Sequence, residues 1–126
     1  MKATDLMVGD YCLVKPSMMP IKVAAVHQKK VAYHAVSNKL NWVRESLLEP
    51  IPLTPEILEK NGFAIENDDT YVWRHESGLE KIIWFNGGCT TVVSVRCDSI
   101  YEGYCYDVHE LQHALKICGI RKEIEL

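Results

Sequence analysis

The residues with the clearest chemical potential lie near the end of the chain, where His109-Glu110-Leu111-Gln112-His113 matches the pattern H-E-x-x-H. On a helix, two histidines four residues apart share a face and can bind zinc, and the intervening glutamate can activate a zinc-bound water. Zinc also needs a third protein ligand. The upstream candidates are His75, Cys97, Cys105 and Asp107. Catalytic zinc with Glu110 as the base, and structural zinc, are therefore two alternatives.

A packing role for the same segment is the competing interpretation. Residues 106–119 have the spacing of an amphipathic helix, with Val108, Leu111, Leu115 and Cys118 on one stripe. His109 and His113 fall roughly opposite this stripe, so we expect both to face solvent or a partner. The longer pattern H-E-x-x-H-x-x-G-x-x-H is absent, because Lys116 and Gly119 occupy its last two fixed places. We therefore predict a packing helix, with no catalytic residue and no cofactor.

Two further groups of side chains could bind a ligand. Tyr101, Tyr104 and Tyr106 surround Gly103, and tyrosines offer a flat apolar face and a hydroxyl to a ligand. The same spacing also fits a strand with one half-buried tyrosine face, which is the interpretation we favour. Lys29 and Lys30 could hold the phosphates of a nucleotide whose base stacks on the tyrosines.

Composition sets the class of protein. The chain has 126 residues, of which 48% are hydrophobic and 25% charged, as in an ordinary globular protein of one domain or two small lobes. It has neither a basic-then-apolar N-terminal segment nor an apolar run long enough to span a bilayer. These features predict a cytoplasmic protein with no membrane partner.

Charge is uneven along the chain. Residues 1–45 hold seven Lys/Arg and three Asp/Glu, a net of +4, whereas residues 46–126 hold seven and fourteen, a net of −7. A basic front can attract a polyanion. Its charge density is below that of a dedicated nucleic-acid binder, so this pattern predicts weak nucleic-acid binding at most.

The five cysteines form no C-x-x-C pair, and their number is odd. Without an export signal, such cysteines are expected as free thiols at core-facing positions. Their positions are Cys12, Cys89, Cys97, Cys105 and Cys118.

The elements that must position these residues suggest an α+β fold. Short β-branched and aromatic runs before residue 53 predict an SH3-like or curled small β-barrel. Thr54-Pro55 opens a short helix that ends at Gly62. Three runs then predict an antiparallel sheet covered by the final helix. These runs are 71–75, 79–85 and 89–97, the last with Val93, Val95 and Cys97 on one face. The expected domains are 1–53 and 54–126, or one compact unit.

Three segments resemble a group of small uncharacterised proteins of Bacteroides-type bacteria, their phages and mobile elements. They are Asp5-Leu-x-x-Gly-Asp10, the block Pro-Ile-x-Leu-Thr-Pro-Glu-Ile-Leu-x-x-x-Gly-Phe at 50–63, and Val108-His-x-Leu-Gln-x-Ala-Leu. The resemblance covers most of the chain. It implies a structural role for the final helix, and it brings no activity, cofactor or catalytic residue.

The sequence therefore favours a non-catalytic binding or interaction module of phage or mobile-element type. Its partner would be a protein, a small ligand or a nucleotide, and it could associate with itself. The alternatives are a zinc-dependent hydrolase that uses Glu110 and a weak nucleic-acid binder that uses the basic N-terminal region.

Overall fold

The computed structural model describes all 126 residues and divides the chain into two compact units, unit 1 (Met1–Ile51) and unit 2 (Pro52–Leu126). The chain has three antiparallel sheets and two α-helices, which confirms the predicted α+β class. The division falls two residues before the boundary expected from the sequence. Neither helix is long and apolar enough to cross a membrane.

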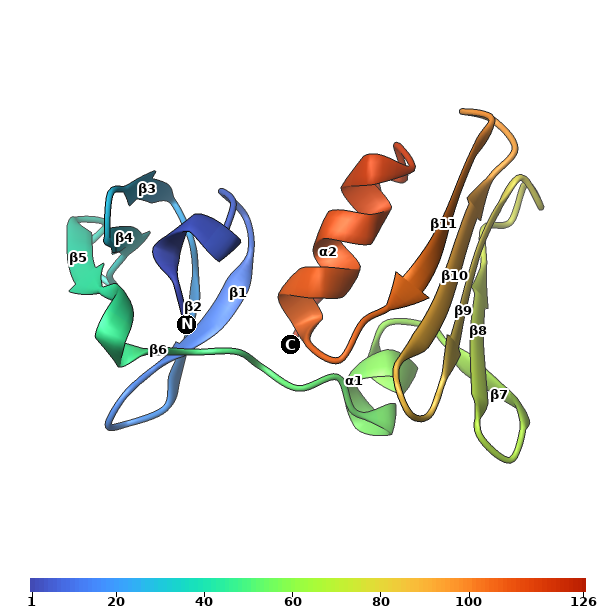
Figure 1. Cartoon of the computed structure of the whole chain (residues 1–126), viewed down its shortest axis with the longest axis horizontal. Coiled ribbons are helices and arrows are strands. Elements are labelled where there is room, and N and C mark those ends of the chain that lie inside the picture. The colour runs from blue at the N-terminus through green and yellow to red at the C-terminus, as the bar shows by residue number, and fades with distance from the viewer. The chain divides into compact units, whose positions relative to one another are not determined.

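Unit 1 contains six strands and no α-helix, as predicted (Figure 1). One sheet has the order β2-β1-β6 and the other the order β3-β4-β5. The strands are β1 (Tyr11–Val14), β2 (Met19–Lys22), β3 (Ala25–His27), β4 (Lys30–His34), β5 (Leu40–Arg44) and β6 (Leu48–Glu49). Two 3-10 turns lie at Ala3–Asp5 and Glu45–Leu47. The two sheets do not close into a barrel, so the predicted barrel is not formed.

The core of unit 1 is small. It consists of Ala3, Leu6, Cys12, Ile21, Val23, Val31 and Leu48. The turn before β1 is held by Asp10, whose Oδ2 accepts a hydrogen bond from the Met7 amide at 2.8 Å, and by Gly9 at φ 94°. This turn brings Leu6 back under the strands, where it is 4% exposed.

Unit 2 begins with the short helix α1 (Pro55–Lys60), which confirms the prediction. The Thr54 hydroxyl caps it by accepting from the Ile57 amide at 3.3 Å, and Pro55 occupies the first turn, where no amide hydrogen is needed. The helix ends before Gly62, whose φ of 87° is unfavourable for other residues. Leu58 and Phe63 anchor it in the core.

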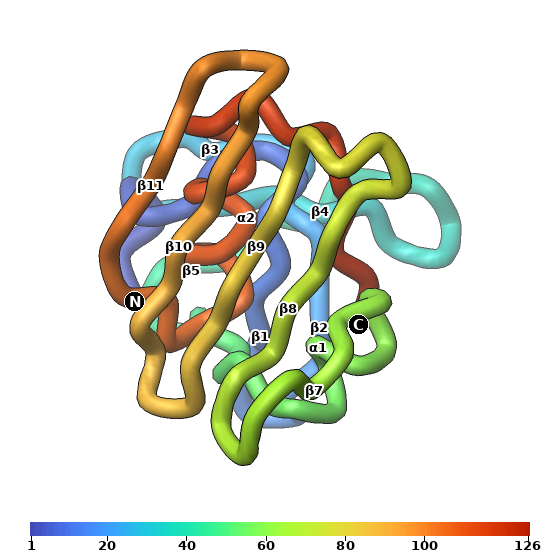
Figure 2. Tube along the Cα trace, turned by 90° about the vertical axis from the view of Figure 1, so that its right-hand side faces the viewer, coloured from blue at the N-terminus to red at the C-terminus, as the bar shows by residue number.

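The rest of unit 2 is a five-stranded meander and one long helix. Figure 2 shows the strands side by side in the order β11-β10-β9-β8-β7, with the helix α2 (Val108–Ile117) behind them. The strands are β7 (Ala64–Asn67), β8 (Thr70–Arg74), β9 (Glu80–Phe85), β10 (Cys89–Ser94) and β11 (Ser99–Tyr104). The runs at 71–75, 79–85 and 89–97 are confirmed as β8, β9 and β10, the last shorter than expected.

The covered face of the sheet is less apolar than the sequence suggested. Ile82, Trp84 and Val92 are buried there, and the Trp84 indole donates to the Cys105 carbonyl at 2.9 Å. Thr90 and Ser94, however, are buried beside Val92, whereas Val93 and Val95 lie on the open face. The Thr90 hydroxyl donates to the Gly88 carbonyl at 2.8 Å, so this buried polar group is satisfied locally.

Candidate functional site

Glu110, the residue that a zinc hydrolase would use as its base, caps the helix on which it lies. Its Oε1 accepts hydrogen bonds from the amides of Tyr106 and Asp107, both at 3.0 Å, while the Asp107 side chain accepts from the Glu110 amide. This reciprocal arrangement is a capping box, which satisfies amides that a helix N-terminus leaves without partners. The carboxylate is therefore held by the backbone at the start of α2.

The two histidines do not lie as the sequence predicted. His109 is only 8% exposed, so the expectation that both rings face solvent or a partner is wrong for this residue, which is buried within the chain itself. Viewed down its axis, with 100° per residue, α2 has its buried residues on an arc of about 220°. The arc begins at Ala114, includes the apolar stripe and ends at His109. The sequence-based assignment failed because this arc is wider than the apolar stripe alone.

The metal alternative does not fit the observed arrangement. The rings of His109 and His113 meet edge to face with centroids 5.7 Å apart. The buried His109 Nδ1 has no hydrogen-bond partner. No group of three or more His, Cys, Asp or Glu side chains is close enough together to hold a metal ion. Neither predicted zinc site is assembled.

The three candidate tyrosines separate into two groups. Tyr104 and Tyr106 are exposed and stack with ring centroids 5.8 Å apart and planes 10° from parallel. Tyr101 lies on the opposite face of β11, paired with the buried Val92. Burial, together with the nearby Cys105 thiol, raises the pKa of the Tyr101 hydroxyl. The favoured interpretation, a strand with one partly buried tyrosine face, describes β11.

Lys29 and Lys30 lie in unit 1, within a face that also carries aromatic side chains. Lys30 is directly opposite Arg44 across the β4–β5 pair and opposite His27 across the β3–β4 pair. The His27 ring meets the half-exposed Trp42 edge to face at 6.4 Å. The tyrosines belong to unit 2, so neither unit alone contains the predicted combination of lysines and tyrosines.

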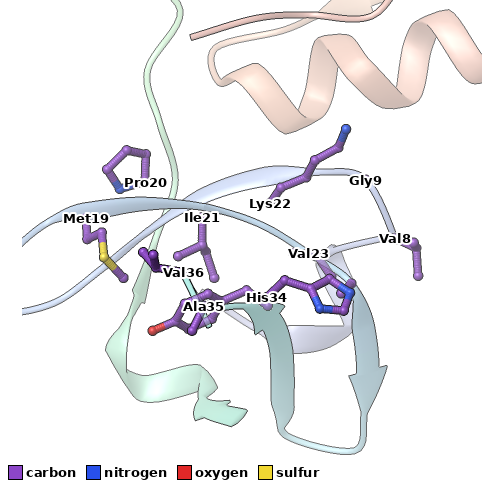
Figure 3. Close-up of a pocket in the computed structure, with 12 residues that line it drawn as sticks. Val8, Gly9, Met19, Pro20, Ile21, Lys22, Val23, His34, Ala35 and Val36 are labelled. Carbon is purple, nitrogen blue, oxygen red and sulfur yellow. The ribbon is translucent and has the colours of Figure 1, made fainter. Parts of the chain in front are cut away.

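A pocket of about 710 Å³ in unit 1 was not predicted from the sequence (Figure 3). We call it the apolar groove. Its walls are β2 with the residues after it and the end of β4, and most of its lining side chains are apolar. They include Val8, Met19, Pro20, Ile21, Val23, Tyr33 and Val36. In Figure 3, Met19, Ile21 and Val36 converge, whereas Lys22 points away from them. Lys22 instead lies over the Tyr11 ring at 5.8 Å.

Backbone groups border the apolar groove on two sides. β2 is an outer strand of its sheet, paired only with β1. β3 pairs with β4 only as far as Ala32, whose carbonyl accepts a hydrogen bond from the Ala24 amide at 2.8 Å. Beyond this point, Tyr33 and His34 pair with β5 on one side and have no partner strand on the other. A signal in the sequence that could have indicated the groove is the pair Met18-Met19 before Pro20, since both methionines are exposed.

All five cysteines are free thiols. Cys12, Cys105 and Cys118 are buried, as expected of core-facing positions, and burial raises the pKa of Cys12 to about 11, with a further contribution from Asp10. Cys89 and Cys97 are exposed, so the core-facing prediction is wrong for these two. Cys89 is on the open face of the sheet, and Cys97 follows the end of β10.

No family model, curated protein or solved structure matches this chain.

Proposed function

We propose that this protein is a non-catalytic binding module whose unit 1, an SH3-like unit, holds an extended apolar peptide segment of a partner protein in the apolar groove. The observation that carries the proposal is the groove itself, a concave site of about 710 Å³ with mostly apolar walls. Ligand sites usually have volumes of roughly 300–1,000 Å³ and walls of this kind. The SH3-like assignment rests on the return of the last strand, β6, to pair with β1.

An extended segment is favoured because strand edges border the groove. A peptide laid along β2 or the end of β4 can form main-chain hydrogen bonds with the unpaired side of either strand. Alternate side chains of such a peptide point the same way, so every second residue could enter the groove. Compact apolar ligands would leave these backbone groups unused.

Charge favours acidic residues on either side of that segment. Residues 1–51 hold seven Lys/Arg and four Asp/Glu, a net of +3. Long-range attraction increases the association rate of an oppositely charged partner and weakens as salt is added. A module of this kind agrees with the resemblance to small phage and mobile-element proteins, which implies no activity.

The test is a titration of the isotope-labelled protein with a synthetic probe, followed by NMR. The probe is an acetylated, amidated peptide of alternating valine and threonine flanked by glutamates. We expect saturable shifts of the amides of residues 19, 21–23 and 33–36. Val36→Asp should weaken binding about tenfold or more, whereas Val95→Asp, the same change at an exposed position of unit 2, should not. Equal binding by both variants, or shifts confined to unit 2, would contradict the proposal.

A second candidate function, weak binding of single-stranded nucleic acid, is favoured by the face around Trp42. Lys30 and Arg44 are opposite each other, and neither cation forms a salt bridge. Like charges in this position destabilise a sheet, and a phosphate between them would remove the repulsion. Trp42 is 48% exposed and could stack on a base.

This second function is tested by fluorescence anisotropy with a labelled oligothymidine at several salt concentrations. The logarithm of the binding constant should fall with the logarithm of salt, with a slope set by about three phosphate contacts. Lys30→Glu should abolish binding, while Lys39→Glu, the same charge change in the β4–β5 turn, should reduce it only slightly. Equal losses in both variants would indicate general attraction to unit 1 and no defined site.

A further inference from the structure

The acidic unit of the protein contains a pocket lined by cations. Residues 52–126 hold seven Lys/Arg and thirteen Asp/Glu, a net of −6. Three of the seven cations, Arg96, Arg121 and Lys122, nevertheless line one pocket of about 350 Å³. The other lining residues are Trp73, His75 and Glu80. Repulsion among like charges makes such a gathering unfavourable unless an anion compensates for it.

Two of these cations lie on a segment that is fixed on both sides. After α2 the chain continues without regular structure, but Ile120 and Ile124 are buried at 5% and 3% exposure and flank Arg121 and Lys122. The Asn61 side chain also bonds to the backbone of Glu125 twice, donating to its carbonyl and accepting from its amide, both at 2.7 Å. The C-terminal segment is thus anchored to the end of α1, which holds the two cations in place.

Strand ends supply the remaining lining residues. Arg96 lies in the turn between β10 and β11, and the neighbouring Val95 amide donates to the Leu79 carbonyl at 2.8 Å. The His75 amide donates to the Glu80 carbonyl at 2.9 Å, which joins the end of β8 to the start of β9. Side chains from these strand ends and from the C-terminal segment therefore meet at one end of the sheet.

An aromatic residue forms part of the pocket wall. The Lys122 ammonium lies 4.9 Å from the centre of the Trp73 ring, in cation–π contact. Burial lowers the pKa of Lys122, an effect that the nearby Glu125 partly offsets. The ammonium is thus partly desolvated, which strengthens its attraction for an incoming anion.

Glu80 is the one acidic residue of the pocket. It is 5% exposed and lines the pocket together with the three cations, none of which forms a salt bridge with it. A carboxylate can only accept hydrogen bonds, so a ligand hydroxyl that donates to it would be favoured in this pocket.

His75 has a defined tautomer in this pocket. The Ser77 amide donates to its Nδ1 at 3.0 Å. Because a backbone amide can only donate, Nδ1 is an acceptor and the neutral ring carries its proton on Nε2. The Nε2–H of the neutral ring is a further hydrogen-bond donor among the side chains that line the pocket.

We propose that this pocket binds a small phosphomonoester that carries a hydroxyl group. Three cations and one carboxylate leave a net charge of +2, which a phosphomonoester of about −1.5 to −2 at pH 7 would neutralise. The two guanidinium groups can hold its oxygens in paired hydrogen bonds, and the hydroxyl can donate to Glu80. This site lies wholly within unit 2 and is independent of the function proposed for unit 1.

The test uses glycerol 3-phosphate, inorganic phosphate and glycerol as probes, with NMR titration at low ionic strength. We expect glycerol 3-phosphate to bind most tightly and to shift the Trp73 indole resonance. Glycerol should not bind. Arg96→Gln and Arg121→Gln should each weaken binding about tenfold or more.

Two further variants complete the test. Arg74→Gln is the matched control, because it makes the same charge change in unit 2 at an exposed residue paired with Glu66 outside the pocket. Its binding should equal that of the wild type. Glu80→Gln should reduce the preference for glycerol 3-phosphate over inorganic phosphate. Absence of saturable binding, or equal losses in all three arginine variants, would overturn the site. An unchanged preference in Glu80→Gln would overturn the role of the hydroxyl.

Discussion

The two units place their apolar side chains differently. Unit 2 has a five-stranded sheet with a helix over one face, and the side chains between them, such as Ile82, Val92 and Leu111, are 0% exposed. Unit 1 has two three-stranded sheets, a core of seven residues and a groove where Met19 and Val36 remain exposed. A unit of about fifty residues buries a smaller fraction of its surface than a larger unit does, and here some of the apolar surface left exposed forms a concave site.

Exposed apolar side chains occur in unit 2 as well, but in another setting. Phe85 and Ile100 are exposed on the open face of the sheet, where Lys81 and Glu102 are interspersed among them. Scattered apolar residues on a flat surface are normal in folded proteins, whereas a concave apolar surface can hold a ligand. The comparison therefore supports a packing role for α2 and its sheet, and it agrees with the binding role that we propose for the groove of unit 1.

The largest expected effect comes from removing core side chains of α2. Leu111→Ala and Leu115→Ala should each lower the free energy of unfolding by about 2–5 kcal/mol, because both residues are almost fully buried. Urea unfolding followed by circular dichroism measures this. Ile117→Ala, in the same helix but 68% exposed, should change it by about 0.5 kcal/mol or less. Comparable losses at Ile117 and Leu115 would contradict the packing assigned to α2.

A smaller effect should come from the cap of α2. Glu110→Ala removes the acceptor of the Tyr106 and Asp107 amides and should cost about 0.5–2 kcal/mol. Glu110→Gln should cost less, because glutamine can also complete a capping box. Thermal unfolding compares the two variants.

A metal role for the same residues predicts the opposite pattern. If zinc stabilised α2, a chelator would lower the melting temperature of the wild type, since metal binding is coupled to folding. We expect no change with a chelator, and the same difference between Glu110→Ala and Glu110→Gln in its presence. Stoichiometric zinc in the purified protein would overturn the cap-only role of Glu110.

The helices were predictable because their signals are local. Thr54-Pro55 and Gly62 define α1, and Asp107 and Gly119 bound the region of α2. Each of these residues acts on backbone groups within a few positions, so the helix boundaries can be predicted from the local sequence alone. The motif around Glu110 was misleading for the same reason, since a capping box also places an acid three residues after the cap.

Features that depend on distant residues were not predictable. Which face of β10 is covered depends on its register with β9 and β11, and Thr90 and Ser94 are tolerated inside because local partners satisfy them. His109 is buried by tertiary packing, which the helical pattern alone does not predict. The pocket around Glu80 requires the C-terminal segment to meet strand ends about 25 to 50 residues upstream, and the apolar groove requires β2 to lie near the end of β4.

A still smaller effect concerns Asp107 and pH. Burial, and then the charge of Glu110, raise the pKa of Asp107 above its ordinary value. The folded state therefore binds this proton more tightly than the unfolded state, and the contribution of Asp107 to stability falls as pH rises from about 4 through the raised pKa. Asp107→Asn keeps an acceptor for the cap. Its stability relative to the wild type should increase from acidic to neutral pH, and the opposite trend would contradict this assignment.

The smallest expected change in stability is at the groove. Val36 is fully exposed, so Val36→Asp should alter the free energy of unfolding by about 0.5 kcal/mol or less while weakening binding of the valine-threonine peptide. Val31→Asp, the same substitution in the core of the same unit, buries a charge without a partner and should unfold unit 1. Measuring stability and peptide binding on both variants separates the two roles that an apolar residue can have in unit 1. If Val36→Asp destabilised the protein by several kcal/mol, the groove would be part of the packed core and the contrast between the two units would fail.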